Sequence, residues 1–211
     1  MTTCDFLVIG GGIIGISIAR ELKKRYPDCK ILLLEKENKC GLHASGRNSG
    51  VLHAGFYYSS DSLKARFTRQ GNKQLTEYCQ SKNLKINKCG KLVVAQNETE
   101  LDSLEELFLR GKQNGITLNK VSKAEAQEIE PRVKTYGQAL FSPTTSTVDP
   151  VEVLSSLHKD IQRDGVEVKT GEKYIGRNNN VVQTQTWSYD AGYIINSAGL
   201  YADVIGKDFG F

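Results

Sequence analysis

The feature that most constrains the fold is a glycine-rich turn between two apolar segments, "DFLVIGGGIIGISIAREL" at residues 5–22. Residues 6–9 form a short apolar run, which predicts a parallel strand buried on both faces. A helix is predicted after the turn, because apolar residues recur there with helical spacing, at Ile14, Ile18, Ala19 and Leu22. The order of these segments is strand, glycine turn and helix.

The turn contains G-x-G-x-x-G, and its three glycines have different physical roles. Gly10 lets the chain turn sharply out of the strand, and Gly12 leaves room for a pyrophosphate against the backbone. Gly15 allows the helix to pack close to the sheet. At the start of the helix, at Ile13 and Ile14, backbone N–H groups and the helix dipole favour a bound phosphate.

A second apolar strand, "CKILLLEK" at residues 29–36, carries Glu35 twenty residues after Gly15. A carboxylate at this offset accepts hydrogen bonds from the adenosine ribose hydroxyls and repels the 2′-phosphate of NADP. Lys36 follows directly and is expected at the same contact. The combined spacing predicts dinucleotide binding. An ordinary glycine-rich turn is the alternative, since glutamates also close strands for other reasons.

A long loop at residues 34–60 has little helical or strand periodicity. Such loops are uncommon in compact domains unless they are functional. Small residues around Arg47 predict an anion cradle and the start of a capped helix aimed at a phosphate, namely Ser45, Gly46, Asn48 and Ser49. A protein that binds NAD in this way usually continues into another βαβ unit, so this loop favours FAD. A mobile surface lid is the alternative.

The remaining patterns predict a second domain inserted into the first. A helix is expected at 63–81 with apolar positions Leu63, Phe67 and Leu75, a strand at 90–96 and a helix at 98–112. Ser122 and Glu125 predict a capping box for a helix that stops at Pro131.

A further helix is expected from Asp149 and Pro150 to Gly165, followed by a hairpin turn at 176–180. The predicted class is therefore α/β, a Rossmann-like FAD-binding domain with an inserted, mainly antiparallel α+β substrate domain. The expected boundaries are 1–82 for the first part of the FAD-binding domain, 83–147 for part of the substrate domain and 148–211 for the return segment.

Composition excludes several other classes. The net charge is +4 with basic and acidic residues interspersed, which argues against a nucleic-acid partner. The five cysteines contain no C-x-x-C pair, so a reduced protein without a metal site is expected. No apolar run approaches the roughly 20 residues that span a bilayer, and no signal peptide is visible. The expected location is cytoplasmic, with peripheral contact at the inner membrane as a second possibility.

Several motifs resemble the L-2-hydroxyglutarate oxidase/dehydrogenase family, FAD-dependent oxidoreductases related to D-amino-acid oxidase. They include "NSGVLHAGFYY", "SLKA" with the following "GN", "CGKLVVA" and "INSAGLYAD". The resemblance implies FAD as cofactor and oxidation of L-2-hydroxyglutarate to 2-oxoglutarate by hydride transfer to the flavin. Members of this family are longer than these 211 residues, so the chain looks truncated.

The resemblance also assigns residues to parts of the cofactor. They are Gly10, Gly12 and Gly15 at the pyrophosphate, Glu35 at the ribose, Ser45, Gly46, Arg47, Asn48 and Ser49 along the pyrophosphate and ribityl chain, His53, Ala54 and Gly55 beside the isoalloxazine ring, Tyr174 at adenine through a backbone group, and Ala198 and Gly199 at the late turn near the flavin.

His53 is the candidate catalytic residue, and three roles stay open for it. It accepts the hydroxyl proton or orients the substrate, it packs against the flavin, or it attaches the flavin covalently. The substrate of a 2-hydroxy-acid oxidoreductase needs cationic or hydroxyl partners, and four residues after the loop are candidates, namely Tyr57, Tyr58, Lys64 and Arg66.

Two function classes follow. The first is an FAD-dependent oxidoreductase acting on a small 2-hydroxy acid, with an amine or amino-acid oxidase as the alternative enzyme. The second is a catalytically silent FAD-binding fragment that lacks the C-terminal half. The electron acceptor stays open among oxygen, a quinone and another protein.

Overall fold

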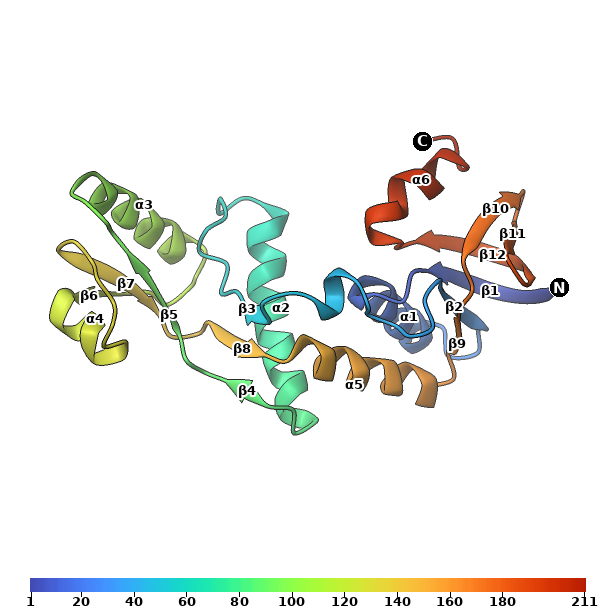
Figure 1. The fold of residues 1–211 in the computed structure, drawn as a ribbon, viewed down its shortest axis with the longest axis horizontal. Coiled ribbons are helices and arrows are strands. Elements are labelled where there is room, and N and C mark those ends of the chain that lie inside the picture. The colour runs from blue at the N-terminus through green and yellow to red at the C-terminus, as the bar shows by residue number, and fades with distance from the viewer. The chain divides into compact units, whose positions relative to one another are not determined.

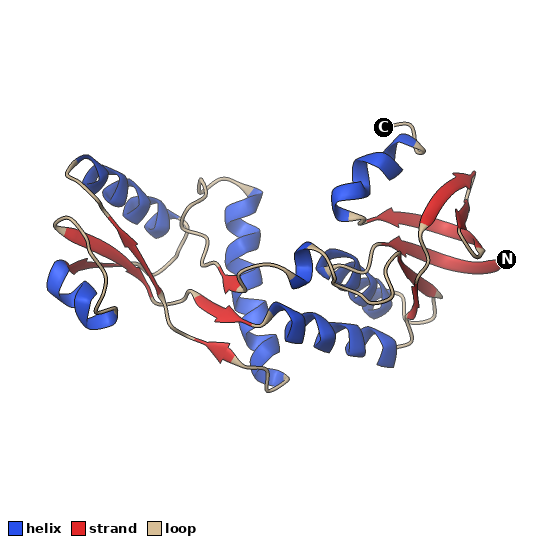
Figure 2. Cartoon of the chain, viewed as in Figure 1, coloured by secondary structure: helices blue, strands red, loops and turns tan.

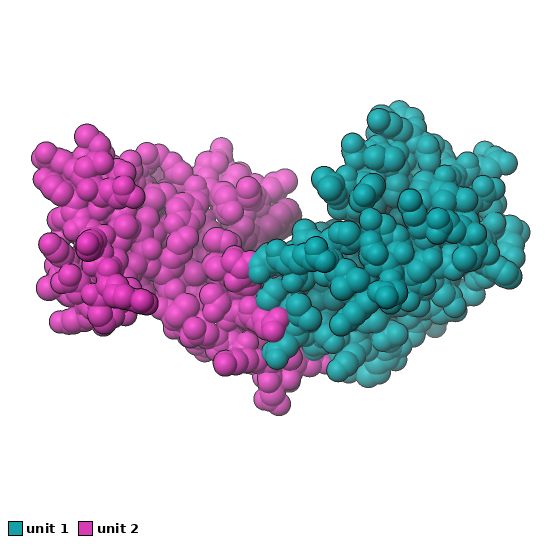
Figure 3. All heavy atoms as spheres, in the orientation of Figure 1, with its two compact units in different colours: residues 1–48, 150–211 teal, residues 49–149 magenta.

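The computed structural model describes residues 1–211, which divide into two compact units (Figure 1). Unit 1 comprises residues 1–48 and 150–211, and unit 2 comprises residues 49–149 (Figure 3). Unit 2 is therefore an insertion in the sequence of unit 1. None of the helices has both the length and the apolar character that crossing a bilayer requires.

Unit 1 is built around a six-stranded sheet with strand order β10-β11-β12-β1-β2-β9. Strands β12, β1, β2 and β9 run parallel, whereas β10, β11 and β12 form an antiparallel meander. Its elements are β1 (Thr2–Ile9), α1 (Ile13–Arg25), β2 (Ile31–Glu35), the 3₁₀ turn η1 (Ala44–Gly46), α5 (Pro150–Arg163), β9 (Glu167–Thr170), β10 (Tyr174–Asn178), β11 (Val181–Thr184), β12 (Ser188–Asn196), η2 (Gly199–Tyr201) and α6 (Ala202–Lys207).

The strand–turn–helix–strand prediction is confirmed, with one correction to the helix face. All five residues of β2 are buried, as expected for a parallel strand in the interior of a sheet. Helix α1 buries Gly15, Ile16 and Ala19. Ile14 is 62% exposed, so its place in the apolar stripe was wrong. Successive helical residues are about 100° apart, and the face that carries Gly15 and Ala19 leaves Ile14 outside.

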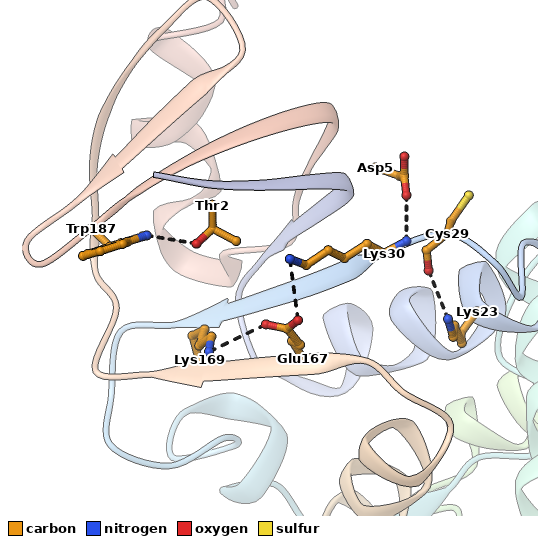
Figure 4. Close-up of polar contacts among 8 residues, drawn as sticks. All are labelled: Thr2, Asp5, Lys23, Cys29, Lys30, Glu167, Lys169 and Trp187. Carbon is orange, nitrogen blue, oxygen red and sulfur yellow. Dashed lines mark hydrogen bonds and ion pairs between the residues drawn. The ribbon is translucent and has the colours of Figure 1, made fainter.

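Polar contacts at the amino ends of the parallel strands fasten that edge of the sheet (Figure 4). Asp5 Oδ2 accepts the backbone N–H of Lys30 at 2.6 Å, and Lys30 Nζ lies 3.7 Å from the Glu167 carboxylate. The indole N–H of Trp187 donates to Thr2 Oγ1 at 3.0 Å. The opposite edge, at the carboxyl ends of the strands, is where ligands of such sheets bind.

Unit 2 contains two three-stranded antiparallel sheets, β3-β8-β4 and β5-β7-β6, with helices α3 and α4 packed against β7 (Figure 2). Phe56, Leu104 and Leu140 are buried in its core. Its elements are β3 (Val51–Leu52), α2 (Leu63–Ser81), β4 (Ile86–Asn87), β5 (Lys91–Val94), α3 (Thr99–Gln113), β6 (Asn119–Ser122), α4 (Lys123–Ile129), β7 (Gln138–Ser142) and β8 (Ser146–Val148).

The observed start of the inserted unit, residue 49, differs from the expected residue 83. Helix α2 joins unit 2 because its side chains reach later parts of that unit. For example, the Arg69 guanidinium donates to the backbone oxygen of Asn114 at 2.9 Å. The predicted apolar face of this helix is also wrong at two positions, since Leu63 is 61% and Phe67 is 56% exposed.

Other local predictions are confirmed. Helix α4 begins with the capping box, in which the Ser122 hydroxyl and the Glu125 carboxylate each accept the other's backbone N–H. Helix α5, the next helix along the chain, belongs to unit 1 and begins at Pro150. Gly165 follows its end with φ +91°. Asn179, at φ 53°, lies in the hairpin between β10 and β11.

Candidate functional site

The glycine turn of unit 1 is shaped by two positions that no side chain can occupy. A Cβ at Gly10 would lie 2.4 Å from the backbone oxygen of Ser197, and Gly10 has φ +112°. A Cβ at Gly15 would lie 1.9 Å from the oxygen of Gly10. The turn, the helix and the chain after β12 therefore approach one another at backbone distance. Ser197 also donates its hydroxyl to the oxygen of Ile9 at 2.9 Å.

The middle glycine of the G-x-G-x-x-G motif, Gly12, has an open side. A Cβ at Gly12 would meet only the Ser45 hydroxyl, at 3.0 Å. Ser45 accepts the backbone N–H of Ile13 at 2.9 Å, so the long loop reaches the first turn of α1. The first N–H groups of a helix have no partner within the helix, and they attract anions. Gly12, Ile13 and Ser45 thus form an open, polar cradle at the start of α1, the place where the sequence predicts a pyrophosphate.

Glu35 is buried directly behind this turn. Its carboxylate accepts the backbone N–H of Gly11 at 2.8 Å and that of Glu37 at 3.0 Å. Each carboxylate oxygen has a further lone pair, so the group retains capacity for ribose hydroxyls. Ribose binding by Glu35 stays a prediction.

Gly11 and Cys40 are site residues that sequence reasoning missed. A Cβ at Gly11 would lie 2.6 Å from Cys40 Sγ and 2.9 Å from Glu35 Oε2. Burial, and secondarily the charge of Glu35, raises the pKa of the Cys40 thiol to about 11. The thiol is therefore a neutral packing group at neutral pH. The run of three consecutive glycines was the available signal for Gly11.

The segment predicted to contact adenine starts beside Glu35. The backbone N–H of Glu172 donates to the oxygen of Glu35 at 2.9 Å, and that of Gly171 to Glu37 at 2.7 Å. Tyr174 follows two residues later at the start of β10, and its hydroxyl donates to Asp208 at 2.9 Å. Burial, followed by this contact, raises the pKa of Tyr174. Its side chain is thus engaged elsewhere, which suits a role for its backbone.

The late turn also reaches this region. Ala198 Cα lies 3.1 Å from where a Gly10 Cβ would be. The ammonium of Lys36 lies 4.2 Å from the centre of the Tyr201 ring, two residues after Gly199. Gly199 has φ +58°, and a Cβ at this position would meet no atom within 4 Å, so the glycine leaves open space beside the turn.

The expected capped helix after Ser45 is wrong. The loop forms only the three-residue turn η1, because the Asn48 amide donates back to the oxygens of Ala44 at 3.1 Å and Ser45 at 3.0 Å. Gly46 is required there, since its Cβ would lie 2.3 Å from the oxygen of Gly41. Arg47, next in the chain, is exposed.

The other predicted flavin residues, Ser49, His53, Ala54 and Gly55, belong to unit 2. Ser49 and His53 are exposed, Ala54 is buried, and Gly55 has φ +103°. Partial burial, and then the positive charge of Lys91, lowers the pKa of His53.

Three side chains that the sequence did not single out hold the loop at residues 52–58. The Asn72 amide donates to the oxygens of Leu52 at 2.9 Å and His53 at 3.3 Å. Asn114 donates to Gly55 at 3.0 Å and Tyr58 at 2.8 Å, while Arg110 donates to Tyr57 at 2.8 Å. The loop that carries His53 is therefore fixed through its carbonyl groups. Only Asn72 had a signal, as part of the quoted "GN".

The candidate substrate residues lie near aromatic rings of this loop and of α2. The ammonium of Lys64 lies 4.6 Å from the centre of the Tyr58 ring, and that of Lys91 lies 4.7 Å from the Tyr57 ring. Arg66 stacks on Phe67, its own neighbour, at 4.8 Å. Nowhere do three or more histidine, cysteine or acidic side chains gather as metal ligands.

Curated relatives match the chain over almost its whole length. The chain is 38% identical to L-2-hydroxyglutarate dehydrogenase of Escherichia coli O17:K52:H18, over 98% of this chain and 50% of the relative. It is 35% identical to the mitochondrial L-2-hydroxyglutarate dehydrogenase of Homo sapiens, over 96% of this chain and 47% of the relative. The chain thus spans about half the length of the curated relatives it matches.

Solved structures show the same fold. The dithionite-reduced L-α-glycerophosphate oxidase of Mycoplasma pneumoniae, with FAD bound, matches 97% of this chain and 56% of its own, with a TM-score of 0.87 and 31% identity. Glycine oxidase of Geobacillus kaustophilus matches all of this chain and 59% of its own, with a TM-score of 0.89 and 22% identity.

The family described as DAO, FAD dependent oxidoreductase, matches residues 5–211. The match includes the glycine turn and the inserted unit alike. The glycine turn by itself suits NAD and FAD equally, and the family match confirms the prediction of FAD from the long loop. The chain belongs to the FAD dependent oxidoreductase family.

Proposed function

We propose that this chain is the FAD-binding part of a flavoprotein that oxidises L-2-hydroxyglutarate to 2-oxoglutarate. The observation that carries the proposal is the 38% identity to a protein of that name along 98% of this chain. The identity extends through unit 2, where His53 and its supporting side chains lie. The proposal thus rests on both units and not on the dinucleotide turn alone.

The residues of unit 1 would hold the adenosine and pyrophosphate parts of FAD. Gly12, Ile13 and Ser45 offer the anion cradle, and Glu35 offers buried acceptors for the ribose. Ser49, His53, Ala54 and Gly55 remain proposed contacts of the flavin half. When bound, FAD supplies an acceptor for two electrons.

In the proposed reaction a ring nitrogen of His53 accepts the proton of the substrate hydroxyl group. A base must be unprotonated before it acts, and the lowered pKa of His53 keeps its imidazole neutral at pH 7. Asn72 fixes the backbone on which the imidazole is mounted. Tyr57, Tyr58, Lys64 and Arg66 are the proposed partners for the substrate's carboxylate groups.

Oxidation of a hydroxyl substrate is favoured over oxidation of an amine. Two relatives above 30% identity are named for L-2-hydroxyglutarate and L-α-glycerophosphate, which both carry hydroxyl groups and negative charge. Glycine oxidase, at 22% identity, supports the fold alone.

The test is anaerobic reduction of the FAD-loaded full-length protein by L-2-hydroxyglutarate, followed at the flavin absorbance bands. We expect bleaching by L-2-hydroxyglutarate and none by glycine or L-proline. Flavin bands that no substrate bleaches would indicate the catalytically silent FAD-binding protein instead.

His53→Ala separates the roles open to this residue. Loss of a general base slows flavin reduction by roughly 10²–10⁴-fold and removes the decline in rate as pH falls through the pKa of His53. His43→Ala is the control, because His43 is exposed and bonded to Glu37 in unit 1. Unchanged reduction by His53→Ala contradicts the base. Flavin that stays with the parent after acid precipitation, but not with the variant, shows a covalent link.

The electron acceptor and the location complete the proposal. Re-oxidation of the reduced protein by oxygen, by a soluble quinone and by an electron-transfer protein will select among the three acceptors. We propose a cytoplasmic location with peripheral contact at the inner membrane, and sedimentation with anionic lipid vesicles tests the contact.

A further inference from the structure

Lys91 is a cation in unit 2 that has no carboxylate partner. It is the first residue of β5, its side chain is partly buried, and its ammonium lies 4.7 Å from the centre of the Tyr57 ring. No ion pair joins it to any acidic residue of the chain. An ammonium over an aromatic face has N–H donors that the ring does not use and that remain able to bind an anion.

A neighbouring lysine makes this absence informative. Lys120 lies on β6, on the other side of β7, with its ammonium 4.6 Å from the centre of the Phe108 ring. Lys120 is also paired with the carboxylate of Glu105. Both lysines lie on strands that pair with β7, and both contact an aromatic ring, but the chain supplies a carboxylate only to Lys120.

Hydrogen bonds place Lys91 beside the loop that carries His53. Gly90, the preceding residue, donates its N–H to the oxygen of Thr145 at 3.0 Å. The Asn72 amide donates to the oxygen of Thr144 at 3.3 Å as well as to that of His53 at 3.3 Å. The turn between β7 and β8 therefore ties the start of β5 to His53 through one amide.

Lys91 and His53 are thus both held relative to the turn between β7 and β8. Arg110 binds the oxygen of Tyr57, the residue under the Lys91 ammonium, and Arg110 itself is paired with Glu106. Of the cations around the loop, Lys64 lies over Tyr58, while the charge that acts on the His53 pKa is that of Lys91.

We propose that Lys91 binds the second carboxylate group of the substrate and so selects dicarboxylic over monocarboxylic 2-hydroxy acids. The inference rests on the proposed function, because it assumes that the substrate's hydroxyl group meets His53. The chemistry is an ion pair between the substrate's second carboxylate and the ammonium of Lys91, which lies over Tyr57 in the loop that carries His53.

Binding of unreactive acids tests this without turnover. Glutarate and butyrate differ by one carboxylate, and their affinities for the FAD-loaded full-length protein are measured by calorimetry. We expect the parent to prefer glutarate, and Lys91→Met to lose about 10- to 100-fold in glutarate affinity with butyrate affinity unchanged. Lys91→Arg keeps the charge and should keep most of the preference. Lys120→Met is the matched control and should bind as the parent does.

A second measurement needs neither cofactor nor substrate. The chain has only three histidines, so the His53 imidazole can be assigned in NMR spectra by substitution and titrated. Removing the Lys91 charge should raise the pKa of His53, because a positive neighbour disfavours imidazolium. Lys120→Met should leave this pKa unchanged.

Equal glutarate and butyrate affinities in the parent, or a preference that survives Lys91→Met, would overturn the inference. An unchanged His53 pKa in Lys91→Met would overturn the placement on which it depends. A glutarate preference that depends on Lys91, in a protein whose flavin L-2-hydroxyglutarate does not reduce, would support the carboxylate site while refuting the proposed function.

Discussion

The loop at residues 40–48 of unit 1 and the loop at residues 52–58 of unit 2 have little regular structure, yet different forces hold them. The first packs closely at glycines that leave no room for a side chain: a Cβ at Gly11 would lie 2.6 Å from Cys40 Sγ, and one at Gly46 would lie 2.3 Å from the oxygen of Gly41. The second is held by side-chain donors, chiefly Asn72 and Asn114, which satisfy its carbonyl groups. Close packing at glycines thus shapes the loop at residues 40–48, and side-chain hydrogen bonds shape the loop at residues 52–58.

This difference determines how each loop responds to substitution. Adding one carbon to the first loop creates a steric clash that the backbone cannot avoid. Removing one amide from the second leaves buried carbonyl oxygens without a donor, which costs about 1–3 kcal/mol. We therefore expect added side-chain volume to destabilise the first loop, and removal of a side-chain hydrogen-bond donor to destabilise the second.

The largest expected effect is that of Gly15→Ala. The new Cβ would lie 1.9 Å from the oxygen of Gly10, so α1 must move away from the turn. We expect destabilisation of unit 1 at or above the upper end of the roughly 1–3 kcal/mol that overpacking costs. Chemical denaturation measures it. The control is Gly71→Ala, at a helical glycine of unit 2 with nothing within 4 Å, which should stabilise by about 0.5–1 kcal/mol. Equal effects at both sites would contradict the comparison.

Gly12→Val should separate binding from folding. Its Cβ meets only the Ser45 hydroxyl, so the fold is retained while the branched side chain fills the anion cradle. We expect at least a tenfold loss of FAD affinity, or about 1.4 kcal/mol or more, with little change in the unfolding midpoint. Gly176→Val, at an open position of β10, is the control. Full flavin content in the Gly12 variant would refute the pyrophosphate assignment.

Asn114→Ala compares a buried amide with an exposed one. Asn114 is 6% exposed and donates to two carbonyls of the second loop, and Asn48 donates to two carbonyls of the first. We expect Asn114→Ala to cost about 1–3 kcal/mol, less some relief because its own Oδ1 is buried without a partner. Asn48→Ala should cost under about 0.5 kcal/mol, since water replaces the amide. Hydrogen exchange at residues 53–58 should rise only in the Asn114 variant.

Ser45→Ala should have the smallest effect of the four. It removes the acceptor of the Ile13 N–H at the start of α1, much as removal of a helix cap does, and should cost about 1 kcal/mol. FAD affinity should fall by less than in Gly12→Val, because the backbone of the cradle remains. A Ser45 variant as deficient in flavin as Gly12→Val would show that the hydroxyl group, and not the open space at Gly12, recognises the cofactor.

The sequence predicted the local structure of the glycine turn far better than the contacts of the loop at residues 52–58. A glycine is read directly from the sequence, and the spacing of Gly10, Gly15 and Glu35 follows from the geometry of one βαβ unit. The donors Asn72, Arg110 and Asn114 lie 19 to 59 residues from the carbonyls of this loop that they bind, at positions fixed by tertiary packing. Local periodicity carries no information on such contacts.

The wrong predictions have the same origin. Leu63 and Phe67 have the spacing of a buried helix face, yet α2 buries Ala65 and Cys79 instead. The boundary expected at residue 83 followed the order of the elements along the chain. In the structure α2 belongs to unit 2, because its side chains bond to later residues of that unit, as Arg69 does to Asn114. The capped helix expected after Ser45 fails because the Asn48 amide closes a tighter turn on its own segment.

The pairing of β1 with β12 gives this chain an unusual order of assembly during synthesis. Thr2 and Trp187, bonded across that pair, are 185 residues apart. At about 5–20 residues per second, a ribosome needs roughly 10–40 s to make the partner of the first strand. Unit 2 is contiguous and has all its residues before then. Through that interval the apolar residues Leu7, Val8 and Ile9 lack the strand β12 that pairs with them in the folded protein. The glycine turn is the first of the motifs to be translated, but its packing against Ser197 is completed only after residue 197 has been made.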